Sequence, residues 1–404
     1  MLLSDAGDPI VFWQYAERYL GAGTRTYSSY AGDLEISPAY HPQLGAESFT
    51  VPSVRVPSGL GSYLRSAIPS PLHELYAGAG EFVLPVHPNA LDFPGLVGRD
   101  LLAACAPGPE FEVVPSANAR TVFVSTMDGV PVPPHFVKLH YPRRLSRFTR
   151  RLRRPVIGLQ MWVAEELARV GAPVVPEVGG GFVGETDDAW GFLVRAAAPL
   201  DTAPPFVVPL FALYGGDFRA PEDPTLLEQL VAASGAPAAR FIAERIVEPM
   251  VRLWVRVALG TGCSLETHGQ NTLFAFSADG RDTRVLYRDC AVYVDAGIRQ
   301  RLGLRRPLPP TNVIGRDVLK PTKAVFSLGF DSFMGHHALS YVAALAERRL
   351  GVDPALLRGA GRRAFAEECR SEDLLPATVF YYENALYADG GWELVDTGEW
   401  PLWR

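Results

Sequence analysis

The sequence predicts an α+β protein in which antiparallel sheets pack against helices. Three observations lead to this fold class. Short apolar runs bounded by turn residues fill residues 81–140, a helical period replaces them from about residue 146, and long helical patterns surround a second hairpin after residue 225. At 404 residues the chain is long enough for two or three domains, or for one large one.

The predicted strands of the first half form one antiparallel sheet. Residues 81–87 are apolar and end at His87-Pro88, and residues 111–114, 120–125 and 136–140 follow as further strands. Asp128-Gly129 lies between two apolar runs and indicates a hairpin turn. Residues 190–194 read as one more buried strand.

Helical periodicity is expected in five segments. Residues 9–20 form a short one, and residues 146–170 a longer one in which Pro155 kinks or restarts the helix. Residues 225–233, 238–259 and 339–350 complete the set. Between them, residues 271–276 and 285–287 read as a hairpin around Asp279-Gly280.

Composition narrows the class of protein. The net charge of −6 argues against a general nucleic-acid binder. No apolar run is long enough to span a membrane, and the first residues do not resemble a signal peptide. The four cysteines, Cys105, Cys263, Cys290 and Cys369, form no C-x-x-C pair, so a cytoplasmic protein with reduced thiols is expected.

The strongest chemical signal is a polar turn followed by a hairpin. Residues 265–271 read Leu-Glu-Thr-His-Gly-Gln-Asn, and Arg288-Asp289 follow the second strand of the hairpin. Asn271 and Asp289 would lie at the ends of adjacent strands, where hard oxygen ligands suit Mg²⁺. The alternative is a polar turn beside an ordinary hairpin with an exposed aspartate.

A second signal is the basic stretch of residues 138–154. Arg143, Arg147, Arg150 and Arg154 would share one helical face. Bidentate arginines are well matched to phosphates, so this face predicts a nucleotide-phosphate site. The alternatives are a solvated helix face and, given the acidic total charge, a less favoured nucleic-acid surface.

These motifs resemble, in order, those of the siderophore synthetases that act independently of nonribosomal peptide synthetases, the aerobactin-synthetase (IucA/IucC-like) family. The resemblance spans about residues 80–345. Its pieces are Leu-Pro-Val-His-Pro at 84–88, Asn-x-Arg-Thr at 118–121, Lys-Leu at 138–139 with the arginines to 150, the 268–271 and 288–289 motifs, and Lys-Ala at 323–324.

The resemblance implies an ATP- and Mg²⁺-dependent ligase. Members of that family convert a carboxylic acid to an acyl-adenylate, which an amine or hydroxyl then attacks. Their fold is likened to a cradling hand with thumb, fingers and palm. The expected partners are therefore small-molecule acids and nucleophiles, with no nucleic acid and no membrane, and a homodimer is possible.

Roles follow from the matching positions. Arg144, His268 and Lys138 would be catalytic, while His87 and Lys323 would contact the substrate. Glu266, Asn271 and Asp289 would hold the metal. The nucleotide would be held by Arg120, Thr121, Lys138, Arg144, Ser146, Arg150, His268 and Asn271.

The N-terminal region departs from the resemblance. Only His41-Pro42 represents the family's His-Pro-x-x-Lys element, so a reduced thumb is expected at residues 1–78. Residues 79–205 would form the fingers and residues 206–404 the palm. Two other functions stay open: a small-molecule kinase that uses Mg-ATP, suggested by His-Gly-x-Asn followed by Asp289, and a non-catalytic binding protein derived from the synthetases.

Overall fold

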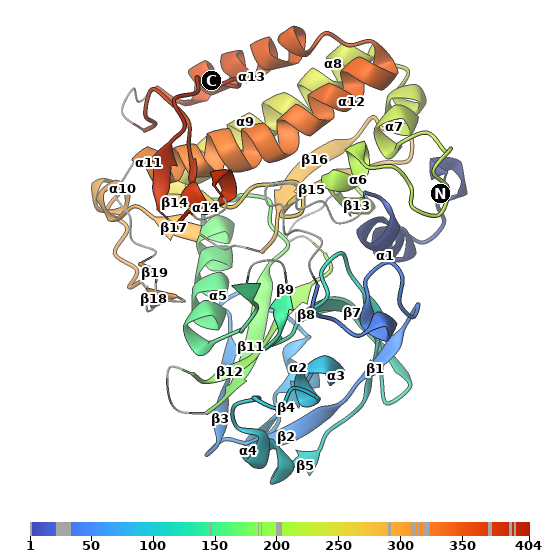
Figure 1. Ribbon diagram of the computed structural model, residues 1–404, viewed down its shortest axis with the longest axis vertical. Coiled ribbons are helices and arrows are strands. Elements are labelled where there is room, and N and C mark those ends of the chain that lie inside the picture. The colour runs from blue at the N-terminus through green and yellow to red at the C-terminus, as the bar shows by residue number, and fades with distance from the viewer. Residues whose placement is uncertain are drawn as a thin grey trace.

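A seven-stranded antiparallel sheet occupies the lower half of the molecule (Figure 1), with strand order β1-β6-β7-β8-β12-β11-β3. The computed structural model describes residues 2–21, 34–145, 148–184, 186, 188–198, 204–289, 292–308, 312–313, 316–317, 323–370, 374–387, 390–391 and 393–404. The strands of this sheet are β1 (Phe49–Val51), β3 (Gly61–Arg65), β6 (Phe111–Pro115), β7 (Thr121–Met127), β8 (Val130–Lys138), β11 (Glu177–Val183) and β12 (Trp190–Ala196).

The predicted antiparallel sheet is confirmed for the strands after residue 110, but the inclusion of residues 81–87 is wrong, because β4 (Glu81–Pro85) belongs to a second, smaller sheet. Asp128 and Gly129 both have positive φ between the paired residues Met127 and Val130, which is the geometry of a two-residue type I′ hairpin. A smaller sheet, β4-β2-β5, packs below it around a shared core that includes Val56, Leu84 and Val137. Its strands are β2 (Ser53–Pro57), β4 (Glu81–Pro85) and β5 (Ala106–Pro107), with the short helices α2 (His73–Tyr76), α3 (Pro88–Leu91) and α4 (Arg99–Ala103) nearby.

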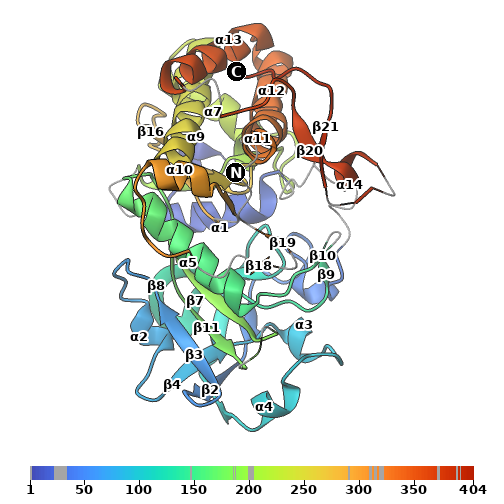
Figure 2. The ribbon, with the colours of Figure 1, turned by 90° about the vertical axis from the view of Figure 1, so that its left-hand side faces the viewer.

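Helix α5 (Arg154–Arg169) lies between the lower sheet and the upper helices (Figure 2). The prediction that this helix starts near residue 146 is wrong. Pro155 lies in its first turn, and Arg153 before it has extended backbone angles. Proline favours the first turn of a helix, so the helix begins here, and the described arginines Arg143 and Arg150 precede it and do not share its helical face.

The upper half combines a three-stranded antiparallel sheet with long helices (Figure 1). The sheet order is β13-β15-β16, and the predicted hairpin of residues 271–287 forms two of these strands. Two helical runs contain π-helical segments, α8–η3–α9 and α11–η4–α12. The bounds are β13 (Phe206–Pro209), β15 (Thr272–Phe276), β16 (Thr283–Tyr287), α7 (Leu226–Ser234), α8 (Ala238–Ile242), η3 (Ala243–Val247), α9 (Glu248–Thr261), α11 (Lys323–Ser327), η4 (Leu328–Leu339), α12 (Ser340–Leu350) and α13 (Pro354–Glu368).

Residues 1–78 contribute to both halves. Helix α1 (Pro9–Tyr19) places Phe12 and Ala16 in the upper core, whereas β1 and β3 are the two edges of the lower sheet. A further apolar cluster, in which Trp13 contacts Phe136 at 5.2 Å between ring centroids, joins the two halves. The boundaries of the thumb, fingers and palm stay predictions.

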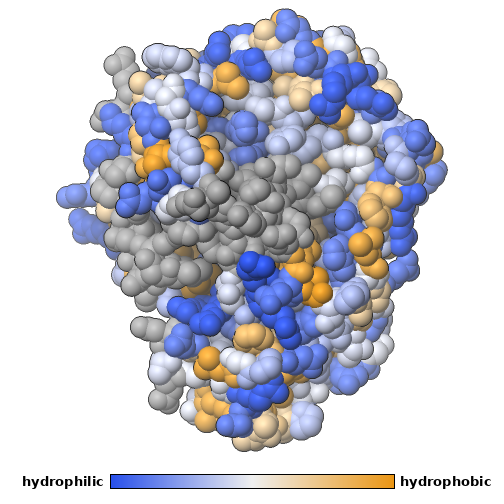
Figure 3. All heavy atoms as spheres, in the orientation of Figure 1, coloured by the Kyte–Doolittle hydropathy of each residue, from blue (hydrophilic) through white to orange (hydrophobic). Residues whose placement is uncertain are grey.

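The remaining helices and strands are short. None of the described helices is long and apolar enough to cross a membrane. On the face shown in Figure 3 the described residues are mostly hydrophilic, with hydrophobic ones scattered among them. The short elements are η1 (Leu3–Asp5), η2 (Pro38–Tyr40), α6 (Phe211–Tyr214), α10 (Ala296–Arg301), α14 (Glu383–Leu386), β9 (Arg144–Leu145), β10 (Phe148–Thr149), β14 (Cys263–Leu265), β17 (Val292–Val294), β18 (Asn312–Val313), β19 (Arg316–Asp317), β20 (Phe380–Tyr382) and β21 (Leu394–Asp396).

Candidate active site

The two halves are joined by backbone contacts at the end of the β15–β16 hairpin. The segment after α5 runs beside β16, where Tyr287 donates its N–H to the Pro173 carbonyl at 3.1 Å and accepts from Val175 at 2.9 Å. This contact brings the residues that follow β16 to the ends of β8 and β12. The candidate site lies at that junction.

A buried ion pair forms the centre of the site. Lys138 Nζ lies 2.6 Å from Asp289 Oδ1, and the Lys138 side chain is 4% exposed. In the sheet, Lys138 pairs with Thr121 on β7 and with Leu193 on β12, so these three side chains share one face. Gln160 of α5 also accepts from Lys138 Nζ, at 3.4 Å.

A second ion pair stands beside the first. Arg195 donates to Glu177 Oε1 through Nε at 2.9 Å and through Nη2 at 2.7 Å, and both side chains are buried. Arg195 Nη2 also lies 3.8 Å from Asp289 Oδ2. With Arg120, the cluster holds three cations and two carboxylates, so one positive charge is in excess.

Burial and the neighbouring charges shift the pKa values of Lys138 and Asp289. Burial lowers the pKa of Lys138 to about 8, with Arg120 and Arg195 acting in the same direction and Asp289 against them. Burial alone would raise the pKa of Asp289, but Lys138 and Arg195 hold that pKa well below its usual range. The cluster therefore keeps the Asp289 carboxylate ionised and contains a lysine that titrates near pH 8.

Asp289 also has an unusual backbone. Its φ is +55°, and among the described non-glycine residues only Asp128 of the hairpin turn shares a positive φ. A left-handed residue costs of order 1 kcal/mol and is held in place by its surroundings. Here the strain lets the chain leave β16 with the Asp289 carboxylate directed at Lys138.

The polar turn before β15 is built around His268. Its Nδ1 accepts from the Gln270 N–H at 3.3 Å, and its carbonyl accepts from the N–H groups of Asn271 and Thr272. Asn271 Nδ2 donates to the Glu266 carbonyl at 3.0 Å, which leaves Asn271 Oδ1 as an acceptor. The turn is fastened to η4 because Thr267 Oγ1 donates to the Gly329 carbonyl at 3.1 Å.

A buried ion pair fixes the hairpin to the N-terminal helix. Arg288 binds both carboxylate oxygens of Glu17, and its Nε donates to the Gln270 carbonyl at 2.9 Å. Glu17 also accepts from Trp13 Nε1 at 3.0 Å. The Glu17–Arg288 pair therefore links helix α1 to the polar turn and to the chain immediately before Asp289.

The structure brings together several of the predicted residues. Lys138 and Asp289 are in contact, Thr121 lies beside Lys138 in the sheet, and Arg120 acts electrostatically on both members of the pair. Arg120 Nη1 donates to the Arg150 carbonyl at 2.7 Å, which places the two arginines side by side. Glu266, His268 and Asn271 lie together on the turn before β15.

Of the other predicted residues, the structure buries one and exposes two. His87 is fully buried, its Nδ1 caps α3 by accepting from the Asn89 N–H, and burial lowers its pKa to about 3. The contact between His87 and the substrate stays a prediction. Arg144 is exposed on β9, and Lys323 is exposed at the start of α11. Ser146 lies outside the described residues.

Sequence patterns did not single out Glu17, Gln160 or Glu177 for the site. Each is a charged or amide residue in a largely apolar segment. In the structure, all three residues are at most 4% exposed. Burial of such side chains requires a partner, so their position inside apolar segments was the available signal.

The described part of the site contains few side chains that could bind a metal ion. Among the described residues, no three His, Cys, Asp or Glu side chains gather as a metal site. Glu266, Asn271 and Asp289 do supply hard oxygens, which is the chemistry that Mg²⁺ prefers. Because the neighbouring cations outnumber the carboxylates, these oxygens fit a metal that enters together with an anionic ligand.

Solved structures with this architecture include two aerobactin synthetases and a petrobactin biosynthesis protein. The chain superposes on the aerobactin synthetase IucC from a hypervirulent pathotype of Klebsiella pneumoniae with a TM-score of 0.63 at 14% identity, over 90% of this chain and 71% of that one. The petrobactin biosynthesis protein AsbB from Bacillus anthracis str. Sterne gives a TM-score of 0.66 at 12% identity, over 93% and 75%.

This chain has the fold of those synthetases. The ATP-bound aerobactin synthetase IucA from the same Klebsiella pathotype agrees, with a TM-score of 0.58 at 16% identity over 88% of this chain and 71% of that one. No protein-family model and no curated protein matches the chain by sequence. The predicted fold class, α+β of the synthetase type, is confirmed.

Proposed function

We propose that the protein is an ATP-dependent synthetase that adenylates a carboxylic acid and condenses it with an amine or hydroxyl compound, in siderophore or related natural-product biosynthesis. The observation that carries this proposal is the buried Lys138–Asp289 pair with Arg195 and Arg120, at the junction of the two halves. The fold shared with synthetases, one of them solved with ATP, supports it.

The cluster suits a reaction in which a nucleophile attacks a phosphorus atom of a nucleotide. In the proposed reaction a carboxylate oxygen attacks the α-phosphorus of ATP, pyrophosphate leaves, and the nucleophile then displaces AMP with loss of a proton. Negative charge develops on the phosphoryl oxygens and on the departing pyrophosphate. Lys138 and Arg120 are fixed cations in a buried setting, where they stabilise such charge strongly.

Magnesium would neutralise phosphate oxygens when bound with the nucleotide. Glu266, Asn271 and Asp289 would hold it, and His268 would face the phosphates from the same turn. Asp289 has a second function in this proposal, because it orients Lys138 and keeps that lysine protonated at neutral pH.

Product analysis tests the reaction class. The protein is incubated with Mg-ATP, a panel of carboxylic acids and hydroxylamine, and we expect AMP, pyrophosphate and a hydroxamate. Formation of ADP instead would contradict the synthetase and favour the small-molecule kinase. A protein that neither turns over nor binds nucleotide in calorimetry would be the non-catalytic binding protein.

The pKa of Lys138 predicts how nucleotide affinity depends on pH. Lys138 is charged below about pH 8 and loses its charge above it, so affinity for ATP should be constant from pH 6.5 to 7.5 and decline above 8. The decline should approach about tenfold per pH unit. Titration calorimetry across this range measures it.

Lys138→Arg provides the control for the pH profile. A guanidinium stays protonated throughout this range, so the decline should disappear even if the absolute affinity changes. An unchanged decline in Lys138→Arg would show that another group titrates.

A further inference from the structure

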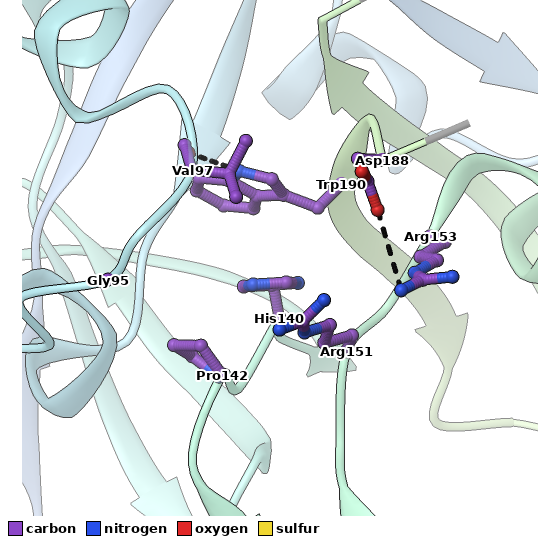
Figure 4. A pocket seen from close by; sticks show the side chains of 8 residues that line it. All are labelled: Gly95, Val97, His140, Pro142, Arg151, Arg153, Asp188 and Trp190. Atoms are coloured by element: carbon purple, nitrogen blue, oxygen red, sulfur yellow. Dashed lines mark hydrogen bonds and ion pairs between the residues drawn. The ribbon is translucent and has the colours of Figure 1, made fainter. Parts of the chain in front are cut away.

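A small pocket whose lining includes neither Lys138 nor Asp289 opens on the lower half (Figure 4). Its enclosed volume is about 10 Å³, room for about one water-sized group, and the rest of the recess is open to solvent. Val97 and Trp190 form one side, His140 lies beneath Trp190, and Arg151 and Arg153 lie on the other side. Gly95, Pro142 and Asp188 complete the lining.

The floor of the pocket is rigid. The rings of His140 and Trp190 stack with centroids 4.4 Å apart, and Trp190 Nε1 donates to the Val97 carbonyl at 2.8 Å. Both side chains are at least 95% buried. The rings of His140 and Trp190 are therefore held in position before any ligand arrives.

His140 offers a hydrogen-bond donor to the pocket. Its Nδ1 accepts from the Leu152 N–H at 3.2 Å, so in the neutral ring the proton is on Nε2. None of the residues that the structure describes accepts a hydrogen bond from Nε2. Burial, reinforced by Arg120 and Arg151, lowers the pKa of His140 to about 3, so the ring stays neutral in this tautomer at physiological pH.

Two guanidinium groups add positive charge. The Arg151 side chain is exposed, and Arg153 Nη2 lies 3.4 Å from Asp188 Oδ1. Asp188 is 62% exposed, and an exposed pair of this kind is weak, so a ligand can displace it. Fork-shaped guanidinium donors match the paired oxygens of a carboxylate or phosphate.

We propose that this pocket, formed by His140, Arg151, Arg153 and Trp190, is a binding subsite for one oxyanion group, a carboxylate or a phosphate, carried by a small molecule. The subsite is separate from the Lys138–Asp289 pair, and it does not depend on the proposed reaction. It lies next to that cluster along the chain, because His140 follows Lys138 by two residues and Arg151 follows Arg150.

Calorimetry of the full chain with pyrophosphate and, separately, with citrate tests the subsite and distinguishes the two sources of the oxyanion. We expect one of them to bind in a step that Arg151→Gln weakens at least tenfold. Arg154→Gln is the matched control, because Arg154 is also exposed but lies over the Phe182 ring at 4.9 Å, outside the pocket. It should change the affinity less than twofold.

Two further variants complete the test. His140→Asn keeps an acceptor near the Leu152 N–H and removes the Nε2 donor, so it should also weaken the step, whereas Lys138→Gln should leave it in place. The proposal is overturned if neither anion binds or if Arg151→Gln and Arg154→Gln have equal effects. It is also overturned if Lys138→Gln abolishes binding that Arg151→Gln retains, since the anion would then belong to the Lys138 cluster.

Discussion

Replacing Asp289 with asparagine is expected to lower the rate of ATP turnover by about 100- to 1000-fold. The substitution keeps the size of the side chain but removes the charge that faces Lys138 at 2.6 Å and Arg195 at 3.8 Å. Without that charge the pKa of Lys138 falls further, so less of the lysine is protonated near pH 7, and one of the oxygens proposed to hold Mg²⁺ is lost as well.

Asp282→Asn is the matched control for this prediction. Asp282 is exposed on the same hairpin, before β16, and makes no side-chain contact with the cluster. Steady-state release of pyrophosphate measures turnover, and circular dichroism checks that both variants are folded. A folded Asp289→Asn variant with the same rate as Asp282→Asn would remove Asp289 from the site.

Replacing Glu17 with glutamine is expected to lower the free energy of unfolding by about 3–5 kcal/mol. The change leaves the guanidinium of Arg288 buried without its counter-charge, and both side chains are at most 4% exposed in the native protein. The hydrogen bond from Trp13 Nε1 can persist to the amide oxygen, so the loss reports mainly on the ion pair.

Urea denaturation measures the stability of Glu17→Gln against a control in the same region. Glu47→Gln removes a carboxylate that pairs with Arg219 on the surface, where 80% of its side chain is exposed, so the unfolding midpoint should not change. Equal midpoints for the two variants would contradict the structural importance of the Glu17–Arg288 pair.

Local sequence patterns were sufficient for the elements whose signals are short-range. Asp128-Gly129 predicted its hairpin because both positions adopt positive φ, and residues 271–287 predicted theirs through Asp279-Gly280. Helix α5 was predicted with the wrong start, since the helical period was extended across Pro155. Helix α13 was missed although Asp353 caps it and Pro354 opens it, because its apolar periodicity is weak.

The candidate site was predictable only in part, for a physical reason. The sequence by itself determined which residues are proposed for the chemistry, namely Lys138, Asp289, Asn271 and the arginines, and it determined the hairpins that present Asn271 and Asp289. Only the tertiary structure decided that Lys138 meets Asp289 across 151 residues of chain, that Glu177 holds Arg195 and that His87 is a buried cap. Partners of buried charges are chosen by long-range packing, which no local periodicity encodes.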